Sequence, residues 1–152
     1  MATGKSTLAR HLAKATHRWM LDTDTLIESM SGQTVSETFA TSGEGAFRSL
    51  EIELSKWLQG HVQGAVIATG GGMPLVCNNL RGIGEVIWID TPFELIYQRL
   101  HSLDQQAHRP LAQDETTLKN RYDQRRTIYE KTAHRRIEGS GTIDEVLRRI
   151  IG

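Results

Sequence analysis

The sequence predicts an α/β fold with a mainly parallel sheet, built as one domain over residues 1–152. Two observations predict it. Short apolar runs alternate with segments of helical periodicity, which is the pattern of successive strand–helix–strand units. Polar or glycine residues follow the apolar runs, as they do where ligands gather at the carboxyl edge of such sheets. The strands are expected at residues 19–21, 65–69, 85–89 and 135–138.

The chain opens with a glycine-rich loop followed by a helix. MATGKST matches the end of the phosphate-loop pattern G-x-x-x-x-G-K-[ST], in which Gly4 lets the backbone curl, Lys5 reaches the β and γ phosphates and Ser6 binds Mg²⁺. Apolar residues at helical spacing follow, so the first amides of this helix point toward the nucleotide. The predicted ligand is a nucleoside triphosphate, and the residues expected to bind it are Ala2, Thr3, Gly4, Lys5, Ser6 and Thr7.

The first glycine of this pattern, and the strand that normally leads into the loop, would lie before Met1. In a doubly wound sheet that strand is central and is hydrogen-bonded on both sides. Two interpretations follow: upstream residues are missing from this chain, or the protein folds with an interrupted sheet. We favour the first.

Capping signals and helical periodicity place the helices. Three T-x-x-E capping boxes predict helix starts at Thr34/Glu37, Thr41/Glu44 and Thr142/Glu145. Two further helices are expected over residues 92–103 and 116–131. The polar segment at about 104–115 contains Arg109-Pro110 and is predicted to be a mobile lid.

Asp22 and Asp24 follow the first predicted strand. Alternate residues of an extended segment point the same way, so both carboxylates could face the phosphate loop, one holding a metal-bound water and the other a substrate hydroxyl. The alternative is that Asp24 only caps a helix that begins at Thr25. Beside a phosphate loop we favour the functional interpretation.

Gly70, Gly71 and Gly72 follow the second predicted strand. Consecutive glycines expose backbone amides and let a ligand approach without a Cβ atom in the way. An ordinary turn is the alternative. The position at the carboxyl edge of a strand favours contact with a substrate or an anion.

Three arginines are candidate anion ligands: Arg48, Arg109 and Arg125. Arg48 lies off the apolar stripe of its predicted helix, Arg109 lies in the lid, and Arg125 precedes Tyr129 by four residues. A guanidinium group can hold a carboxylate or phosphate through two parallel hydrogen bonds. The other arginines are expected at the solvated surface, among them Arg126, Arg135, Arg136, Arg148 and Arg149.

The charge balance limits the classes of partner. Eighteen basic residues match eighteen acidic ones, so no overall field favours nucleic acid or a membrane surface. Cys77 is the single cysteine, which excludes an internal disulfide and a cysteine cluster for zinc and favours a reducing compartment, the cytoplasm. We expect a small-molecule enzyme that binds neither nucleic acid nor membrane, and the small domain favours a monomer.

The ordered motifs resemble those of the shikimate kinases over essentially the whole chain. The segments that carry the resemblance are MATGKSTLARHLA, LDTDTLIE, TFATSGEGAFRSLE, ATGGGM, RPL of the lid and RRTIYEKTA. The resemblance implies a phosphate-loop, three-layer α/β/α fold like that of nucleoside monophosphate kinases. Its parallel sheet would have the order 2-3-1-4-5, with strand 1 missing from this chain.

The resemblance also implies a reaction, the transfer of the ATP γ-phosphate to the 3-hydroxyl of shikimate in the route through chorismate to aromatic amino acids, with Mg²⁺ as cofactor. Lys5 would bind the phosphates, Ser6 and Asp22 would hold the metal, and Asp24 would bind the substrate hydroxyls and accept a proton. The implied substrate-binding region spans about 24–60. The other implied substrate ligands are Arg48, Gly70, Gly71, Gly72 and Arg125, and the implied nucleotide ligands include Arg99 beside adenine and Arg109, a catalytic residue of the lid.

Two alternatives remain open at this point. A gluconate-type small-molecule kinase would share the phosphate loop, but two arginines placed for a carboxylate fit shikimate better. A non-catalytic ligand-binding paralogue would result if the N-terminal strand were truly absent, although Lys5, Ser6, Asp24 and Arg109 are all present.

Overall fold

The computed structural model describes residues 3–106 and 114–152, apart from the side chains of residues 103–106. Helices and strands alternate along it, as the sequence predicts. The elements are α1 (Lys5–Ala15), β1 (Met20–Asp22), α2 (Thr23–Ser31), α3 (Val35–His61), β2 (Val66–Ala68), α4 (Met73–Val76), α5 (Leu80–Ile83), β3 (Ile87–Asp90), α6 (Phe93–Gln106), α7 (Glu115–Thr132), β4 (Arg135–Glu138) and α8 (Ile143–Ile151).

The four strands form two separate parallel pairs in the described part of the chain, in the order β1-β2 and β3-β4. Met20 lies opposite Val66 in the first pair, and Ile87 lies opposite Arg135 in the second. All four strands were predicted; β4 has the predicted bounds, and the others differ from prediction by one or two residues at their ends. The sheet is therefore interrupted between β2 and β3.

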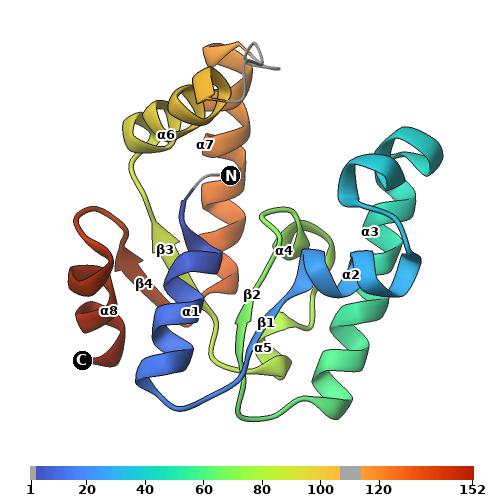
Figure 1. Ribbon diagram of the computed structural model, residues 1–152, viewed down its shortest axis with the longest axis horizontal. Coiled ribbons are helices and arrows are strands. Elements are labelled where there is room, and N and C mark those ends of the chain that lie inside the picture. The colour runs from blue at the N-terminus through green and yellow to red at the C-terminus, as the bar shows by residue number, and fades with distance from the viewer. Residues whose placement is uncertain (1–2, 107–113) are drawn as a thin grey trace.

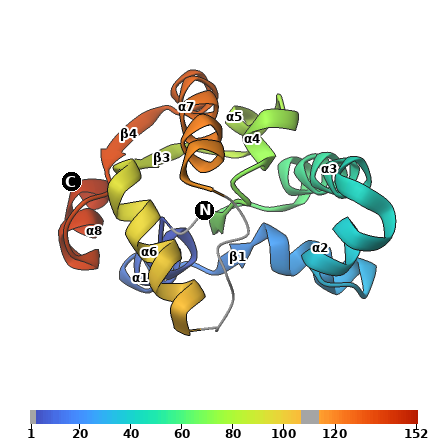
Figure 2. The same cartoon turned by 90° about the horizontal axis from the view of Figure 1, so that it is seen from above.

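Helices cover the strands on both sides, which gives a three-layer arrangement. Figure 1 shows β1 and β2 beside α2 and α3, and β3 and β4 beside α8, with α1 between the two pairs. Seen from above, α1 and α8 lie on one side of β3 and β4 and α7 lies on the other (Figure 2). In the described residues no helix is both long and apolar enough to cross a membrane.

Within residues 3–106 and 114–152, the hydrophobic core has two separate parts, one for each pair of strands. The first joins α1, β4 and α8 and contains the buried residues Leu8, Ile137, Val146 and Ile150. The second lies under α3, α4 and α5 and contains the buried residues Leu58, Met73, Cys77 and Leu80. The interruption of the sheet thus separates the apolar interior as well.

Two of the three predicted capping boxes form. Thr34 and Glu37 cap α3, and Thr142 and Glu145 cap α8, each with both reciprocal hydrogen bonds. The box predicted at Thr41 was wrong, because the hydroxyl of Thr41 donates to the carbonyl of Glu37 inside α3. The backbone leaves the helical conformation at Gly43, whose φ of 80° is open to glycine at little cost, so α3 consists of two helical segments joined by a kink just after Thr41.

We predict that Thr34→Ala lowers the free energy of unfolding by about 1 kcal/mol, because it leaves the amide of Glu37 in the first turn of α3 without its side-chain acceptor. Thr41→Ala is the matched control. It removes the same atoms from the same helix, and we expect a change below about 0.5 kcal/mol since no terminal amide depends on it. Urea unfolding followed by circular dichroism measures both variants. Equal losses would show that Thr41 acts as a cap after all.

Candidate functional site

The phosphate-loop residues form the N-terminus of α1. Gly4 is the N-cap residue and adopts a left-handed conformation with φ 78°. The ammonium group of Lys5 donates to Thr3 Oγ1 at 3.2 Å. Burial lowers the pKa of Lys5, while the nearby Asp24 carboxylate acts in the opposite direction. A partly desolvated cation therefore lies at the positive end of a helix, which is a favourable place for a phosphate.

Asp22 links the phosphate loop to the end of β1. Its Oδ2 atom accepts a hydrogen bond of 2.7 Å from Ser6 Oγ. Its Oδ1 atom accepts from the amides of Asp24 and Thr25, at 3.1 and 3.5 Å. Asp22, rather than Asp24, is thus the N-cap of α2, so the capping alternative considered for Asp24 does not hold.

Asp24 lies in the first turn of α2, not in an extended segment, so the alternation argument was wrong for its backbone. Its carboxylate is nevertheless turned into the protein, and Asp24 Oδ1 is buried without a hydrogen-bond partner. Burial raises the pKa of Asp24, and the negative charge of Asp22 adds to the effect while Lys5 opposes it. Protonation of the Asp24 carboxylate, or a hydrogen bond donated to it, would therefore stabilise the protein.

The glycine loop packs directly on these side chains. The amide of Gly70 donates to Thr23 Oγ1 at 2.8 Å. A Cβ atom at Gly70 would lie 2.6 Å from Asp24 Oδ1, and one at Gly72 would overlap the guanidinium group of Arg48. A side chain at either position would therefore require the Asp24 carboxylate or the Arg48 guanidinium group to move.

Glu51 is a buried charge that we did not predict. Its side chain is almost fully buried, Oε2 accepts from Arg48 Nη1 at 2.6 Å, and Oε1 has no partner. Burial raises the pKa of Glu51, and Arg48 opposes this. The signal in the sequence was a glutamate three residues after Arg48, within a stretch that also carries the apolar face of the helix. Arg48 also binds the exposed carboxylate of Glu44 at 2.8 Å.

Helix α7 brings Arg125 and Tyr129 to the same place. The hydroxyl of Tyr129 donates to the carbonyl of Gly71 at 2.5 Å, which ties α7 to the glycine loop. Burial raises the pKa of Tyr129, and Arg125 opposes this. Arg125 also acts to lower the pKa of Lys5, so two like charges approach each other here. An anion between Lys5 and Arg125 would relieve that repulsion.

Arg126 and Arg136 bind one carboxylate; Arg136 is exposed, as expected for the solvated surface, whereas Arg126 is half-buried. Arg126 Nη1 donates to Asp90 Oδ1 at 2.5 Å, and Arg136 Nε donates to Asp90 Oδ2 at 2.8 Å. The two guanidinium groups lie 5.0 and 5.1 Å from the ring centroid of Trp88. These contacts fix α7 to the carboxyl end of β3, and so they fix the backbone that carries Arg125.

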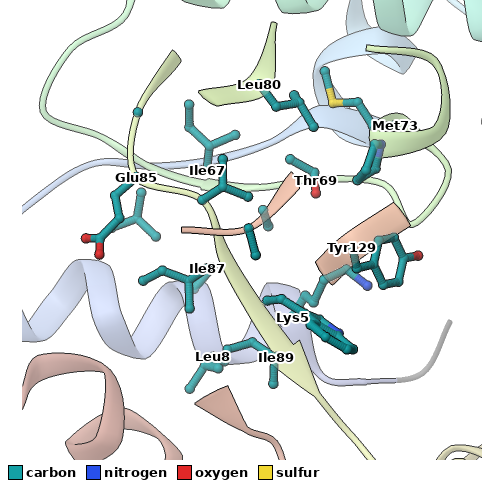
Figure 3. A pocket seen from close by; sticks show the side chains of 18 of the residues that line it. Lys5, Leu8, Ile67, Thr69, Met73, Leu80, Glu85, Ile87, Ile89 and Tyr129 are labelled. Atoms are coloured by element: carbon teal, nitrogen blue, oxygen red, sulfur yellow. The ribbon is translucent and has the colours of Figure 1, made fainter. Parts of the chain in front are cut away.

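A cavity of about 680 Å³ adjoins this cluster, with Lys5, Gly70, Gly71 and Arg125 among its lining residues. Figure 3 shows Lys5 and Tyr129 near each other, with Leu8 and the strand isoleucines further along. Arg99 lies on α6 and is not among the described lining residues. Ala2 and Arg109 fall outside the described residues, as does most of the predicted lid.

No group of three or more histidine, cysteine, aspartate or glutamate side chains that could hold a metal occurs in residues 3–106 and 114–152. The Ser6–Asp22 pair does offer two oxygen atoms beside the phosphate loop. Mg²⁺ is commonly held by one or two protein oxygen atoms together with water and substrate phosphates, so this pair fits the ion.

Comparison with known proteins gives consistent results. A family model described as shikimate kinase matches residues 1–152. The shikimate kinase of Helicobacter hepaticus is 40% identical over 151 residues, which are 99% of this chain and 89% of that protein. The shikimate kinase of Synechococcus elongatus is 36% identical over 157 residues, and the match covers 99% of this chain and 80% of that protein.

Solved structures agree with the sequence comparisons. The shikimate kinase from Aquifex aeolicus superimposes with a TM-score of 0.85 at 31% identity, covering 99% of this chain and 89% of that one. The shikimate kinase from Acinetobacter baumannii, solved in complex with shikimate, gives a TM-score of 0.85 at 33% identity. The match covers 99% of this chain and 86% of that one.

The raised pKa of Asp24 predicts how stability changes with pH. An acid whose pKa is higher in the folded state stabilises the fold while protonated, and that contribution is lost as pH rises from about 4 through the folded pKa. Asp24→Asn cannot ionise, so its stability relative to the parent protein should increase as pH rises through this window. Chemical unfolding at a series of pH values from about 4 to 8 measures this. A difference that does not change with pH would contradict the assigned burial of the charge.

Proposed function

Because this chain belongs to the shikimate kinase family, we propose that the cluster around Lys5, Asp24 and Gly70 is its site of phosphoryl transfer. The chain is an ATP-dependent kinase, and its reaction transfers the γ-phosphate of ATP to the 3-hydroxyl of shikimate in aromatic amino acid biosynthesis. The observation that carries the site assignment is the unpartnered, buried Oδ1 of Asp24, held against Gly70 beside the ammonium group of Lys5.

The nucleotide is proposed to bind at the N-terminus of α1. The amides of Lys5, Ser6 and Thr7 are free of intrahelical partners there, and Gly4 admits the phosphates without a Cβ atom. Thr3 holds the ammonium group of Lys5 until the phosphates replace it. Ala2, outside the described residues, is proposed as the preceding amide of the loop.

Ser6 and Asp22 are the proposed ligands of Mg²⁺. Their side-chain oxygen atoms are 2.7 Å apart, so the hydroxyl of Ser6 would turn from Asp22 to the ion. The ion, when bound, neutralises charge on the phosphates during transfer. Asp22 remains anchored by the amides of α2, which keeps its carboxylate oriented.

Asp24 is the proposed acceptor of the proton from the attacking hydroxyl. A carboxyl group with a raised pKa is a better base than an exposed one, and it gains a hydrogen bond for its orphaned oxygen when the hydroxyl arrives. The glycine loop places substrate atoms against it, because Gly70, Gly71 and Gly72 present backbone rather than side chains.

Arg48 and Arg125 are proposed to hold the carboxylate of shikimate. Glu51 orients the guanidinium group of Arg48 from the buried side. Glu44 occupies its other nitrogen atoms from the exposed side, and such an exposed pair is weak enough for a substrate carboxylate to replace it. Glu51 is then a positioning residue for Arg48.

The other assignments extend beyond this cluster. We propose a substrate-binding region at about 24–60 and a lid at about 104–115, from which Arg109 reaches the transferring phosphate; an arginine of this kind contributes about 10³ to 10⁵ in rate. Arg99 is proposed beside adenine. A monomer in the cytoplasm is proposed as well; for the compartment, the support is the use of a single cysteine, Cys77, in the sequence.

We predict that Asp24→Asn lowers turnover about 10²- to 10⁴-fold, because it removes the proton acceptor while keeping the side-chain shape. ATP binding should change little, since Lys5 and Ser6 remain. A coupled assay of ADP release gives turnover, and titration with an ATP analogue gives binding. Asp123→Asn, an exposed change on α7, is the control. If Asp24→Asn abolished ATP binding, its assigned role would be wrong.

Arg125→Ala should raise the KM for shikimate with a smaller effect on the KM for ATP, because the carboxylate loses one of its two guanidinium partners. Lys131→Ala removes a positive charge from the exposed end of the same helix and serves as the control. Steady-state kinetics with each substrate varied in turn measure both. An unchanged KM for shikimate would remove Arg125 from the clamp.

A further inference from the structure

Arg48 lies between two carboxylates that differ in burial. Its Nη1 atom donates to Glu51 Oε2 at 2.6 Å, and the side chain of Glu51 is only 1% exposed. Its Nε and Nη2 atoms both donate to one oxygen, Glu44 Oε1, at 3.2 and 2.8 Å, and the side chain of Glu44 is 66% exposed. Glu44 therefore occupies, from the solvent side, the fork of N–H groups through which a guanidinium group binds a carboxylate.

The carboxylate of Glu44 has room to move away from Arg48. Glu44 lies between Gly43, where the backbone leaves the helical conformation, and Gly45. A Cβ atom at either glycine would meet no atom from elsewhere in the described chain within 4 Å, so the surroundings are open. Exposed ion pairs are also weak. Glu51, in contrast, is held in the interior and keeps Arg48 oriented when Glu44 moves.

Two arginines of α7 act on the same carboxylate. The hydrogen bond and the positive charge of Arg48 hold the pKa of Glu44 below its usual range, and the charges of Arg121 and Arg125 act in the same direction. Arg121 precedes Arg125 by four residues, which places the two side chains on one face of the helix. Arg121 is half-buried and makes no hydrogen bond or ion pair within the part of the chain that the structure describes. It is thus available as a second partner for Glu44.

We propose that Glu44 is an internal competitor for the substrate carboxylate, since it occupies Arg48 in the free protein. When a substrate carboxylate binds to Arg48 and Arg125, the carboxylate of Glu44 moves to Arg121. Glu44 and Arg121 therefore determine how tightly the site binds a carboxylate, although neither contacts the substrate. This inference rests on the proposed function, in which Arg48 and Arg125 hold the carboxylate of shikimate.

A competitor and a positioning residue have opposite effects on affinity. If Glu44 oriented Arg48 for the substrate, as Glu51 is proposed to do, removal of its charge would weaken the binding of shikimate. As a competitor, Glu44 must first be displaced, so removal of its charge strengthens the binding of shikimate. The sign of the change in affinity distinguishes the two roles.

Isothermal titration with shikimate tests the proposal and requires no turnover. Glu44→Gln removes the charge and keeps the length of the side chain, and we expect the Kd for shikimate to fall about two- to fivefold, the factor that corresponds to a weak, exposed ion pair. Glu53→Gln, the same change at another exposed position on α3, should leave the Kd unchanged. Circular dichroism checks that each variant is folded. An unchanged or higher Kd for Glu44→Gln would overturn the proposal.

Arg121→Gln tests where the carboxylate of Glu44 goes. We expect the Kd for shikimate to rise about two- to fivefold, because the displaced carboxylate loses its second partner. Lys131→Gln, at an exposed position on the same helix, is the control. In a protein that already carries Glu44→Gln, the Arg121→Gln change should have no further effect. Additive effects of the two changes would mean that each charge acts on the substrate independently, and the move of Glu44 to Arg121 would be wrong.

The methyl ester of shikimate lacks the carboxylate charge, and it separates this proposal from the proposed function. We expect the parent protein to prefer shikimate to the ester, and Glu44→Gln to strengthen the binding of shikimate alone. If Glu44→Gln strengthens the binding of both ligands equally, Glu44 is no competitor, while the roles of Arg48 and Arg125 stand. If the parent protein binds the two ligands equally, Arg48 and Arg125 do not hold the carboxylate, and both proposals are wrong.

Discussion

Gly70 and Gly72 approach the side chains of Asp24 and Arg48 so closely that a Cβ atom at either position would displace the carboxylate or the guanidinium group. This contact determines where the rest of the site can lie. The loop that the glycines form is bound to α2 through Thr23 and to α7 through Tyr129, so three elements far apart in sequence meet at its backbone. An alanine at either glycine would shift the carboxylate or the guanidinium group from its present position, and the substitution would act on substrate binding and on packing together.

The energetics of the cluster are unfavourable without a ligand and improve with one. Asp24 and Glu51 are both carboxyl groups with raised pKa values and an oxygen atom lacking a partner, and Lys5 is a partly desolvated cation facing Arg125. Buried charges of this kind cost stability unless they are paired. A substrate with hydroxyl groups and anionic groups would donate hydrogen bonds to the carboxylates and would pair with the cations. The same unpaired groups that lower the stability of the free protein thus increase its affinity for the substrate.

Sequence reasoning found those features of the fold and the site that are local. The phosphate loop, the strand ends and the capping boxes at Thr34 and Thr142 are each determined by a few consecutive residues. The errors arose where contacts between residues distant in sequence determine the structure. Thr41 lies in the last turn before the kink at Gly43, where its hydroxyl donates to the carbonyl of Glu37 instead of capping the segment that follows. Glu51 and Arg126 resemble surface residues in sequence. Glu51 is buried against Arg48, and the half-buried Arg126 pairs with Asp90, a partner that reaches it only when the chain folds.

Both strand pairs join segments that lie far apart in the chain, and neither is a hairpin. The hydrogen bond from Gly70 to Thr23 next to the first pair spans 47 positions, and the one from Arg136 to Asp90 next to the second spans 46. The chain loses conformational entropy when such long loops close, and the contacts between the strands compensate for this only afterwards. Folding is therefore slowed. Helices should therefore form early, and the strands should pair late. During that interval unpaired strands from neighbouring molecules are available to one another, so the yield of refolding should fall as protein concentration rises.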